Sequence, residues 1–128
     1  MANVEKEIEK VISSQNKFLD LVEKLFMGRK KVELKFNKIL IKSREDEIIP
    51  LSALSAGEKQ ILILLLVVLI IGENTILIDE PELSLHVNWQ SEIIDDFKIL
   101  NPEMQLIIAS HSPEIMANVP ENKIFRLP

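Results

Sequence analysis

The stretch Leu54-Ser55-Ala56-Gly57-Glu58-Lys59-Gln60, followed by the run Ile61–Ile71, decides the fold of this chain. Every residue of that run is Ile, Leu or Val. A helix that is apolar on all sides is typical of the interior of a domain, and the run is too short to span a bilayer, which needs about 20 residues. We therefore expect a buried helix whose polar N-terminal tip faces another group.

The polar tip of this helix has two interpretations. In the first, Ser55 and Glu58 form a capping box, in which each side chain satisfies a backbone amide at the helix start, and Gly57 allows close approach of another segment. In the second, the unpaired amides and the positive end of the helix dipole form a seat for a phosphate group. The residues of the tip do not distinguish the two interpretations, so the rest of the sequence has to distinguish them.

Composition indicates a single domain with an aliphatic core. The chain has 128 residues, of which 47% are hydrophobic but only 5% aromatic, and this length suffices for one domain with a core. The absence of cysteine excludes disulfides and thiolate metal sites, and it fits a reducing cytosol. The charged segment Met1–Lys10 is unlike a signal peptide. We expect a cytoplasmic protein with no membrane partner.

Charge is unevenly distributed along the chain. Residues 1–50 carry eleven Lys or Arg and nine Asp or Glu, whereas residues 51–128 carry four and eleven. The acidic second half is unlike a nucleic-acid-binding surface. A basic stretch in the first half is better explained as a solvated face; its members are Arg29, Lys30, Lys31, Lys35, Lys38, Lys42 and Arg44. Nucleic acid therefore stays an unsupported alternative as a partner.

The first part of the chain predicts an amphipathic helix followed by a β-hairpin. Apolar residues recur at steps of three and four between residues 3 and 27, with Glu and Lys between them. Val32–Phe36 and Ile39–Lys42 are then expected as two strands joined by a tight turn at Asn37 and Lys38.

The second part of the chain alternates strand and helix patterns. The expected elements are a strand at Thr75–Ile78, a helix at His86–Leu100, a strand at Gln105–Ala109, a short helix at Pro113–Asn118 and a strand at Lys123–Leu127. Such alternation implies right-handed crossovers and a parallel sheet covered by helices. We accordingly expect an amphipathic helix over residues 1–30 and an α/β lobe over residues 31–128.

Polar residues follow the predicted strands Thr75–Ile78 and Gln105–Ala109. Asp79 and Glu80 end the first of these strands, and Ser110 and His111 end the second. The carboxyl ends of parallel strands share one edge of the sheet, which is where ligands of such sheets bind. Adjacent carboxylates there suit a hard cation such as Mg²⁺. The simpler alternative is that each segment is only a polar loop that caps the next helix.

Four ordered segments resemble motifs of ABC-type ATPases, over about residues 48–128. Leu54–Gln60 resembles the signature motif, and Ile76–Glu80 resembles the Walker B strand. Pro81–His86 resembles the D-loop in the form used by the SMC, RecF and OLD-like branch, and Ile107–Pro113 resembles the switch-histidine segment. The likeness is greatest to the AAA-family ATPases of bacterial antiviral systems such as Septu. It implies a P-loop-NTPase-like α/β fold.

The resemblance also implies a role in ATP hydrolysis for each motif. Glu80 would orient or deprotonate the attacking water and His111 would contact the γ-phosphate, so these two are the candidate catalytic residues. The candidates for cofactor binding are Asp79, which would hold Mg²⁺ through water, and Ser55, Gly57 and Glu58 in the turn that would face nucleotide on an opposing subunit. Residues 82–86 would lie at the dimer contact, and Trp89 and Gln90 would be packing and surface positions.

One motif of the family is missing from this sequence. The only glycines are Gly28, Gly57 and Gly72, and none belongs to a Gly-x-x-x-x-Gly-Lys-Ser/Thr phosphate loop. The chain therefore resembles the C-terminal half of such an ATPase, a partial P-loop-NTPase-like fold without Walker A. We expect it to use Mg²⁺ and ATP only when a partner supplies that loop, and to be inactive alone. The expected partner is a Walker-A-containing ATPase chain or a full-length relative, with self-association as an alternative.

Two other functions remain open at the level of sequence. The chain fits a non-catalytic interaction module, or a truncated decoy that occupies the face of a full-length ATPase relative. A metal-dependent hydrolase is a third possibility. It fits less well than the others, because His86 is expected to lie beyond the loop and no further carboxylate cluster completes a nuclease site. The metal-ligating candidates in that case are Asp79, Glu80, Glu82, His86 and His111.

Overall fold

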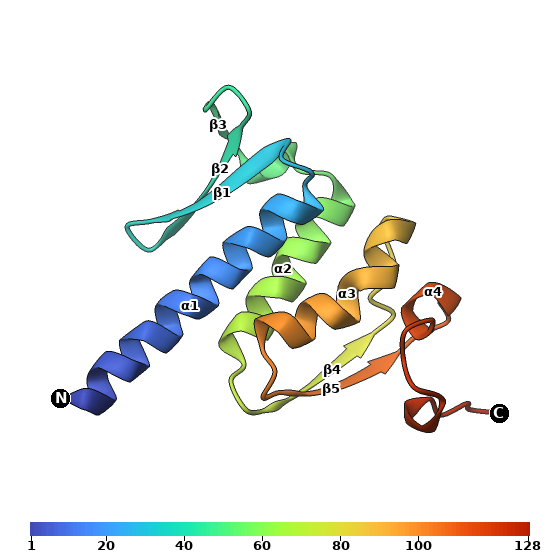
Figure 1. Ribbon diagram of the computed structural model, residues 1–128. Coiled ribbons are helices and arrows are strands. Elements are labelled where there is room, and N and C mark those ends of the chain that lie inside the picture. The colour runs from blue at the N-terminus through green and yellow to red at the C-terminus, as the bar shows by residue number, and fades with distance from the viewer.

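The computed structural model describes all of residues 1–128, and its first element is the long helix α1, Ala2–Leu25 (Figure 1). The C-terminal half of α1 buries Phe18, Leu21, Val22 and Leu25 against the rest of the chain. Apolar residues of its N-terminal half stay exposed, and Figure 1 shows that end projecting beyond the other helices. The amphipathic helix expected over residues 3–27 is thus confirmed, but only half of its apolar stripe is covered.

A small antiparallel sheet follows α1. It consists of β1 (Lys30–Lys35), β2 (Lys38–Ser43) and β3 (Ile48–Ile49), with β2 in the middle. The predicted hairpin is confirmed, although its turn is formed by Phe36 and Asn37, one residue earlier than expected. The strand β3 was not expected. It forms because a short charged loop returns the chain to pair Ile49 with Ile41 of β2.

Helix α2, Ala56–Ile70, begins at Ser55 after the short 3₁₀ turn η1, Leu51–Ala53. It buries one side, which includes Ile61, Leu65 and Val68. The expectation that the helix is buried on all sides is wrong, because Ile63 and Ile70 are exposed. Helices α1 and α3 contact α2 from its buried side, and nothing in the chain covers the opposite side.

The predicted parallel sheet is present but has only two strands. Strands β4 (Thr75–Asp79) and β5 (Gln105–Ala109) run parallel, with Asp79 opposite Ala109, and helix α3 (Val87–Leu100) connects them. The chain ends with the short helix α4 (Pro113–Met116) and the 3₁₀ turn η2 (Glu121–Lys123).

The strand predicted at Lys123–Leu127 does not form. Phe125 and Leu127 are exposed, so the segment packs on neither edge of the sheet. Its apolar pattern spans too few residues to distinguish a strand from an irregular segment, which is why the prediction was wrong.

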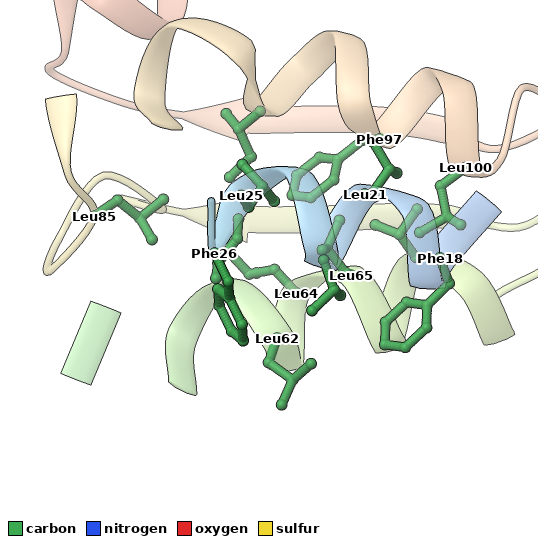
Figure 2. Close-up of a cluster of buried hydrophobic side chains, with 14 of the residues drawn as sticks. Phe18, Leu21, Leu25, Phe26, Leu62, Leu64, Leu65, Leu85, Phe97 and Leu100 are labelled. Carbon is green, nitrogen blue, oxygen red and sulfur yellow. The ribbon is translucent and has the colours of Figure 1, made fainter. Parts of the chain in front are cut away.

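The core lies where the three long helices meet one face of the parallel sheet. A single cluster joins Phe18 of α1, Leu65 of α2, Phe97 of α3 and Ile76 of β4, and Figure 2 shows Leu21, Leu65 and Phe97 of this cluster between the helices. The mixed α/β architecture is therefore confirmed. No helix has both the length and the hydropathy that crossing a membrane demands.

Candidate functional site

The carboxyl ends of β4 and β5 bring Glu80 and His111 together. The backbone amide of Glu80 donates to the Ala109 carbonyl at 2.8 Å, which extends the pairing of the strands by one residue. Glu80 has a positive φ of 48°, an uncommon conformation for this residue type. Its Oε1 lies 3.6 Å from Nε2 of His111, whose side chain is 92% exposed. An acid and an imidazole thus face solvent side by side at this edge.

Asp79 ends strand β4 and has an exposed carboxylate that pairs with no basic side chain. No three or more acidic, His or Cys side chains are grouped to hold a metal ion. Mg²⁺ is commonly held by one or two carboxylates plus waters and substrate phosphates. The single carboxylate of Asp79 fits a Mg²⁺ ion that arrives with a nucleotide.

The turn at the start of α2 is a complete capping box. Ser55 Oγ accepts a hydrogen bond from the Glu58 amide at 3.1 Å, and Glu58 Oε2 accepts one from the Ser55 amide at 2.9 Å. Lys30 of β1 donates to both carboxylate oxygens of Glu58, at 2.7 and 2.9 Å. Burial alone would raise the pKa of Glu58, but the hydrogen bonds from Lys30 and Ser55 outweigh it and lower that pKa. The carboxylate of Glu58 is therefore fully engaged, whereas Ser55 itself is exposed.

Gly57 is buried beneath the loop that follows β4. A Cβ atom at this position would overlap the backbone carbonyl oxygen of Ser84 and lie 3.6 Å from the Trp89 ring. The close-approach interpretation of Gly57 thus has a structural basis, since only glycine leaves room for the Ser84 carbonyl. This contact joins the start of α2 to the loop of residues 80–86.

Glu82 was named from the sequence only as a candidate metal ligand and as part of the dimer contact, and its contact with the segment after β5 was not predicted. Its Oε1 accepts hydrogen bonds from Ser110 Oγ at 2.7 Å and from the His111 amide at 2.8 Å. Desolvation would raise the pKa of Glu82, but the hydrogen bonds, first among them that from Ser110, hold it below its ordinary value. The resemblance indicated a dimer contact for residues 82–86, and no periodic or spacing signal marks Glu82 as a partner of the segment after β5.

Three further residues near the loop also have defined places. Trp89 packs its ring 6.5 Å from that of Phe26, which confirms a packing role. Gln90 is part-buried and hydrogen-bonded to the Leu85 carbonyl at 3.0 Å, so it is not a simple surface position. His86 caps α3 by accepting a hydrogen bond from the Asn88 amide at 3.4 Å.

The sequence matches one family model and several curated proteins. The family model AAA_21, described as "AAA domain, putative AbiEii toxin, Type IV TA system", matches residues 3–117. Among curated proteins, the chain is 36% identical over 53 residues to the "Retron Vc95 probable ATPase" of Vibrio cholerae, and 38% identical over 55 residues to the "Septu protein PtuA" of Bacillus thuringiensis. These alignments span 41% and 43% of this chain.

A solved structure has the same fold. It is the crystal structure of an SMC head bound to the C-winged helix domain of ScpA. The SMC head superposes on 87% of this chain with a TM-score of 0.66 and 21% sequence identity. The match covers 38% of the SMC head chain, and the alignments to the two curated relatives cover 10% and 14% of their lengths. The chain therefore corresponds to a small part of each of these proteins.

The fold of an SMC head is a P-loop NTPase fold, so the resemblance to ABC-type ATPases is confirmed at the level of the fold. With the family model matched over residues 3–117, the chain belongs to the AAA_21 family and is related to ATPases of the SMC, RecF and OLD-like branch.

Proposed function

We propose that this chain supplies the signature turn and the hydrolytic acid of an ABC-type ATPase in a bacterial defence or DNA-repair type system, while a partner supplies the phosphate-binding loop. The observation that carries the proposal is the pairing of Glu80 with His111 at 3.6 Å on the carboxyl edge of β4 and β5. The 128 residues contain no Walker A sequence, so the nucleotide cradle has to come from elsewhere in the assembly.

In this proposal the residues at the sheet edge act on ATP that a partner holds. Glu80 orients the attacking water and accepts its proton, and His111 donates a hydrogen bond to the γ-phosphate. Asp79 would hold Mg²⁺, and the ion when bound would neutralise charge on the phosphates. Phosphoryl transfer needs mainly positioning and charge stabilisation from the protein, which exposed and adjacent side chains such as Glu80 and His111 provide.

The start of α2 serves the same nucleotide from the opposite subunit. Ser55 Oγ satisfies the Glu58 amide, and the amides of Ala56 and Gly57 have no acceptor within the chain. Free amides at the positive end of a helix dipole favour a phosphate group. Glu58 contributes by fixing the turn through its capping bond and its ion pair with Lys30.

Reconstitution with a relative that contains a Walker A loop tests the proposal. We expect the mixture to hydrolyse ATP faster than the relative alone, and Glu80→Gln to abolish the gain, because a general base contributes about 10²- to 10⁴-fold. Glu114→Gln, the same change at an exposed residue of α4, is the matched control and should retain the gain. Absence of any gain, or a gain that survives Glu80→Gln, contradicts the proposal.

The isolated chain offers an independent measurement. Without a phosphate loop it should bind Mg-ATP with a dissociation constant weaker than about 1 mM, which corresponds to about −4 kcal/mol. Tighter binding by calorimetry means that the chain holds nucleotide by itself, and the partner-dependent mechanism is then wrong.

A non-catalytic role is the second candidate, and the bare outer face of the parallel sheet favours it. Leu77 and Ile107 are 75% and 48% exposed there, although parallel sheets are usually covered on both faces. If the chain is a decoy whose exposed sheet face is covered by a full-length relative, we expect the two to bind in the Glu80→Gln variant as well and the mixture to show no added turnover. The same reconstitution therefore separates the two functions.

A further inference from the structure

The switch segment after β5 is held in place by Glu82. One oxygen of this carboxylate, Oε1, accepts both the Ser110 hydroxyl at 2.7 Å and the His111 amide at 2.8 Å. The imidazole of His111, by contrast, is exposed and has only the 3.6 Å approach to Glu80. What fixes the position of His111 is thus its backbone, and the group that fixes that backbone comes from the loop after β4.

The charge of Glu82 matters to this arrangement. Its second oxygen, Oε2, is buried and has no hydrogen-bond partner, and leaving a buried acceptor unsatisfied costs about 1–3 kcal/mol. Hydrogen bonds to a charged acceptor are roughly twice as strong as neutral ones. The unpartnered Oε2 thus disfavours the ionised form, whereas the hydrogen bonds that Oε1 accepts from Ser110 and His111 favour it. The hydrogen bonds prevail, and the pKa of Glu82 lies below its ordinary value.

A second connection reaches the same segment from helix α3. Gln90 Oε1 accepts a hydrogen bond from Ser112 Oγ at 2.7 Å, and Gln90 Nε2 donates to the Leu85 carbonyl at 3.0 Å. Ser112 Oγ also accepts from the Ile115 amide and caps α4. The segment of residues 110–112 is consequently tied at one end to Glu82 and at the other end to Gln90.

We infer that Glu82 is a positioning residue, which sets the placement of His111 relative to Glu80 through the backbone amide of His111. The inference rests on the proposed function, in which His111 meets the γ-phosphate. Glu82 acts through Ser110 and His111 and has no contact of its own with the nucleotide. Its loss should therefore lower kcat and leave the KM for ATP nearly unchanged.

The contact itself is tested by NMR on the isolated chain. The ¹H–¹⁵N signal of the His111 amide should shift with pH at a midpoint below the ordinary pKa of glutamate, because the amide donates to the Glu82 carboxylate. Glu82→Gln should remove that inflection, and Glu114→Gln should leave it. A His111 amide that does not titrate, or that titrates equally in Glu82→Gln, overturns the inference whatever the activity of the assembly.

Turnover in the reconstituted ATPase is the second measurement. We expect Glu82→Ala to lower kcat by about 10- to 100-fold, the equivalent of one or two charge-assisted hydrogen bonds. Glu82→Gln should retain more activity than Glu82→Ala, since its amide oxygen still accepts both donors. Should Glu82→Ala fail to fold, Ser110→Ala removes one donor and keeps the carboxylate, and a smaller loss of kcat is expected.

The outcomes separate the inference from the proposed function. Full kcat in Glu82→Ala and in Ser110→Ala, with turnover still lost in Glu80→Gln, overturns the positioning role and leaves the proposed function intact. If Glu80→Gln itself has no effect on turnover, the proposed function fails and the positioning inference fails with it.

Discussion

Replacing Glu58 by Gln should weaken the fold by removing one ion pair while keeping the capping box. The carboxylate of Glu58 accepts from the Ser55 amide at 2.9 Å and from Lys30 Nζ at 2.7 and 2.9 Å. Gln serves as well as Glu at the third position of a capping box. Glu58→Gln therefore isolates the interaction with Lys30, and Ser55→Ala isolates the cap.

The exposure of the pair sets the expected magnitude. The side chains of Lys30 and Glu58 are 22% and 20% exposed, between the surface and the interior. Exposed pairs contribute about 0.2–1 kcal/mol, whereas breaking a buried pair costs about 3–5 kcal/mol. We expect Glu58→Gln to lower the free energy of unfolding by about 1–2 kcal/mol, and Ser55→Ala to lower it by about 1 kcal/mol through loss of the cap.

A double-mutant cycle measured by urea unfolding tests this estimate. The variants are Glu58→Gln, Lys30→Met and the combination, with Glu114→Gln as an exposed control that should change stability by less than about 0.5 kcal/mol. The coupling energy between positions 30 and 58 should be about 1–2 kcal/mol. A coupling below about 0.5 kcal/mol would show that the pair contributes no more than a surface ion pair, and that β1 does not anchor the start of α2 through Lys30.

Two further predictions concern packing and pH. Gly57→Ala should destabilise the chain in urea unfolding, because the clash with the Ser84 carbonyl (overpacking costs about 1–3 kcal/mol) outweighs the roughly 1 kcal/mol that alanine gains in a helix; a more stable variant refutes the close contact. Burial raises the pKa of Asp96 despite its ion pair with Lys24. The folded state thus binds the Asp96 proton more tightly than the unfolded state, and its contribution to stability falls as pH rises from the ordinary pKa of Asp through the folded value. The contribution of Glu82 has the opposite sign, since its lowered pKa means stability that is lost as pH falls. Asp96→Asn should therefore gain stability relative to the parent chain as pH rises above the ordinary pKa of Asp, measured by urea unfolding; an unchanged difference contradicts the sign.

Elements with a strong local signal could be predicted from the sequence. The apolar run Ile61–Ile71 indicated a helix, and the short apolar segment Thr75–Ile78 after a turn indicated a strand. The capping box at Ser55 is local as well, because all of its partners lie within one helical turn. The proximity of Glu80 and His111 followed from topology alone, since parallel strands joined by one helix place their carboxyl ends at the same edge.

Features that depend on contacts between distant segments could not be predicted. The role of Gly57 as a contact for Ser84 depends on where the loop after β4 packs, and no sequence period records that. The bonds from Ser110 and His111 to Glu82 likewise join segments that only the fold brings together. The strand predicted at Lys123–Leu127 was wrong because a pattern of five residues does not distinguish a strand from an irregular segment.

The loop of residues 80–86 unites the motifs that the sequence shows as separate. It carries Glu80 at its start, it presents Glu82 to the segment that contains His111, and its Ser84 carbonyl lies on Gly57 at the start of α2. The bare sheet face has a related consequence. Side chains alternate along a strand, so Asp79 lies on the same exposed face of β4 as Leu77. A partner that covers Leu77 therefore also meets the carboxylate proposed to hold Mg²⁺.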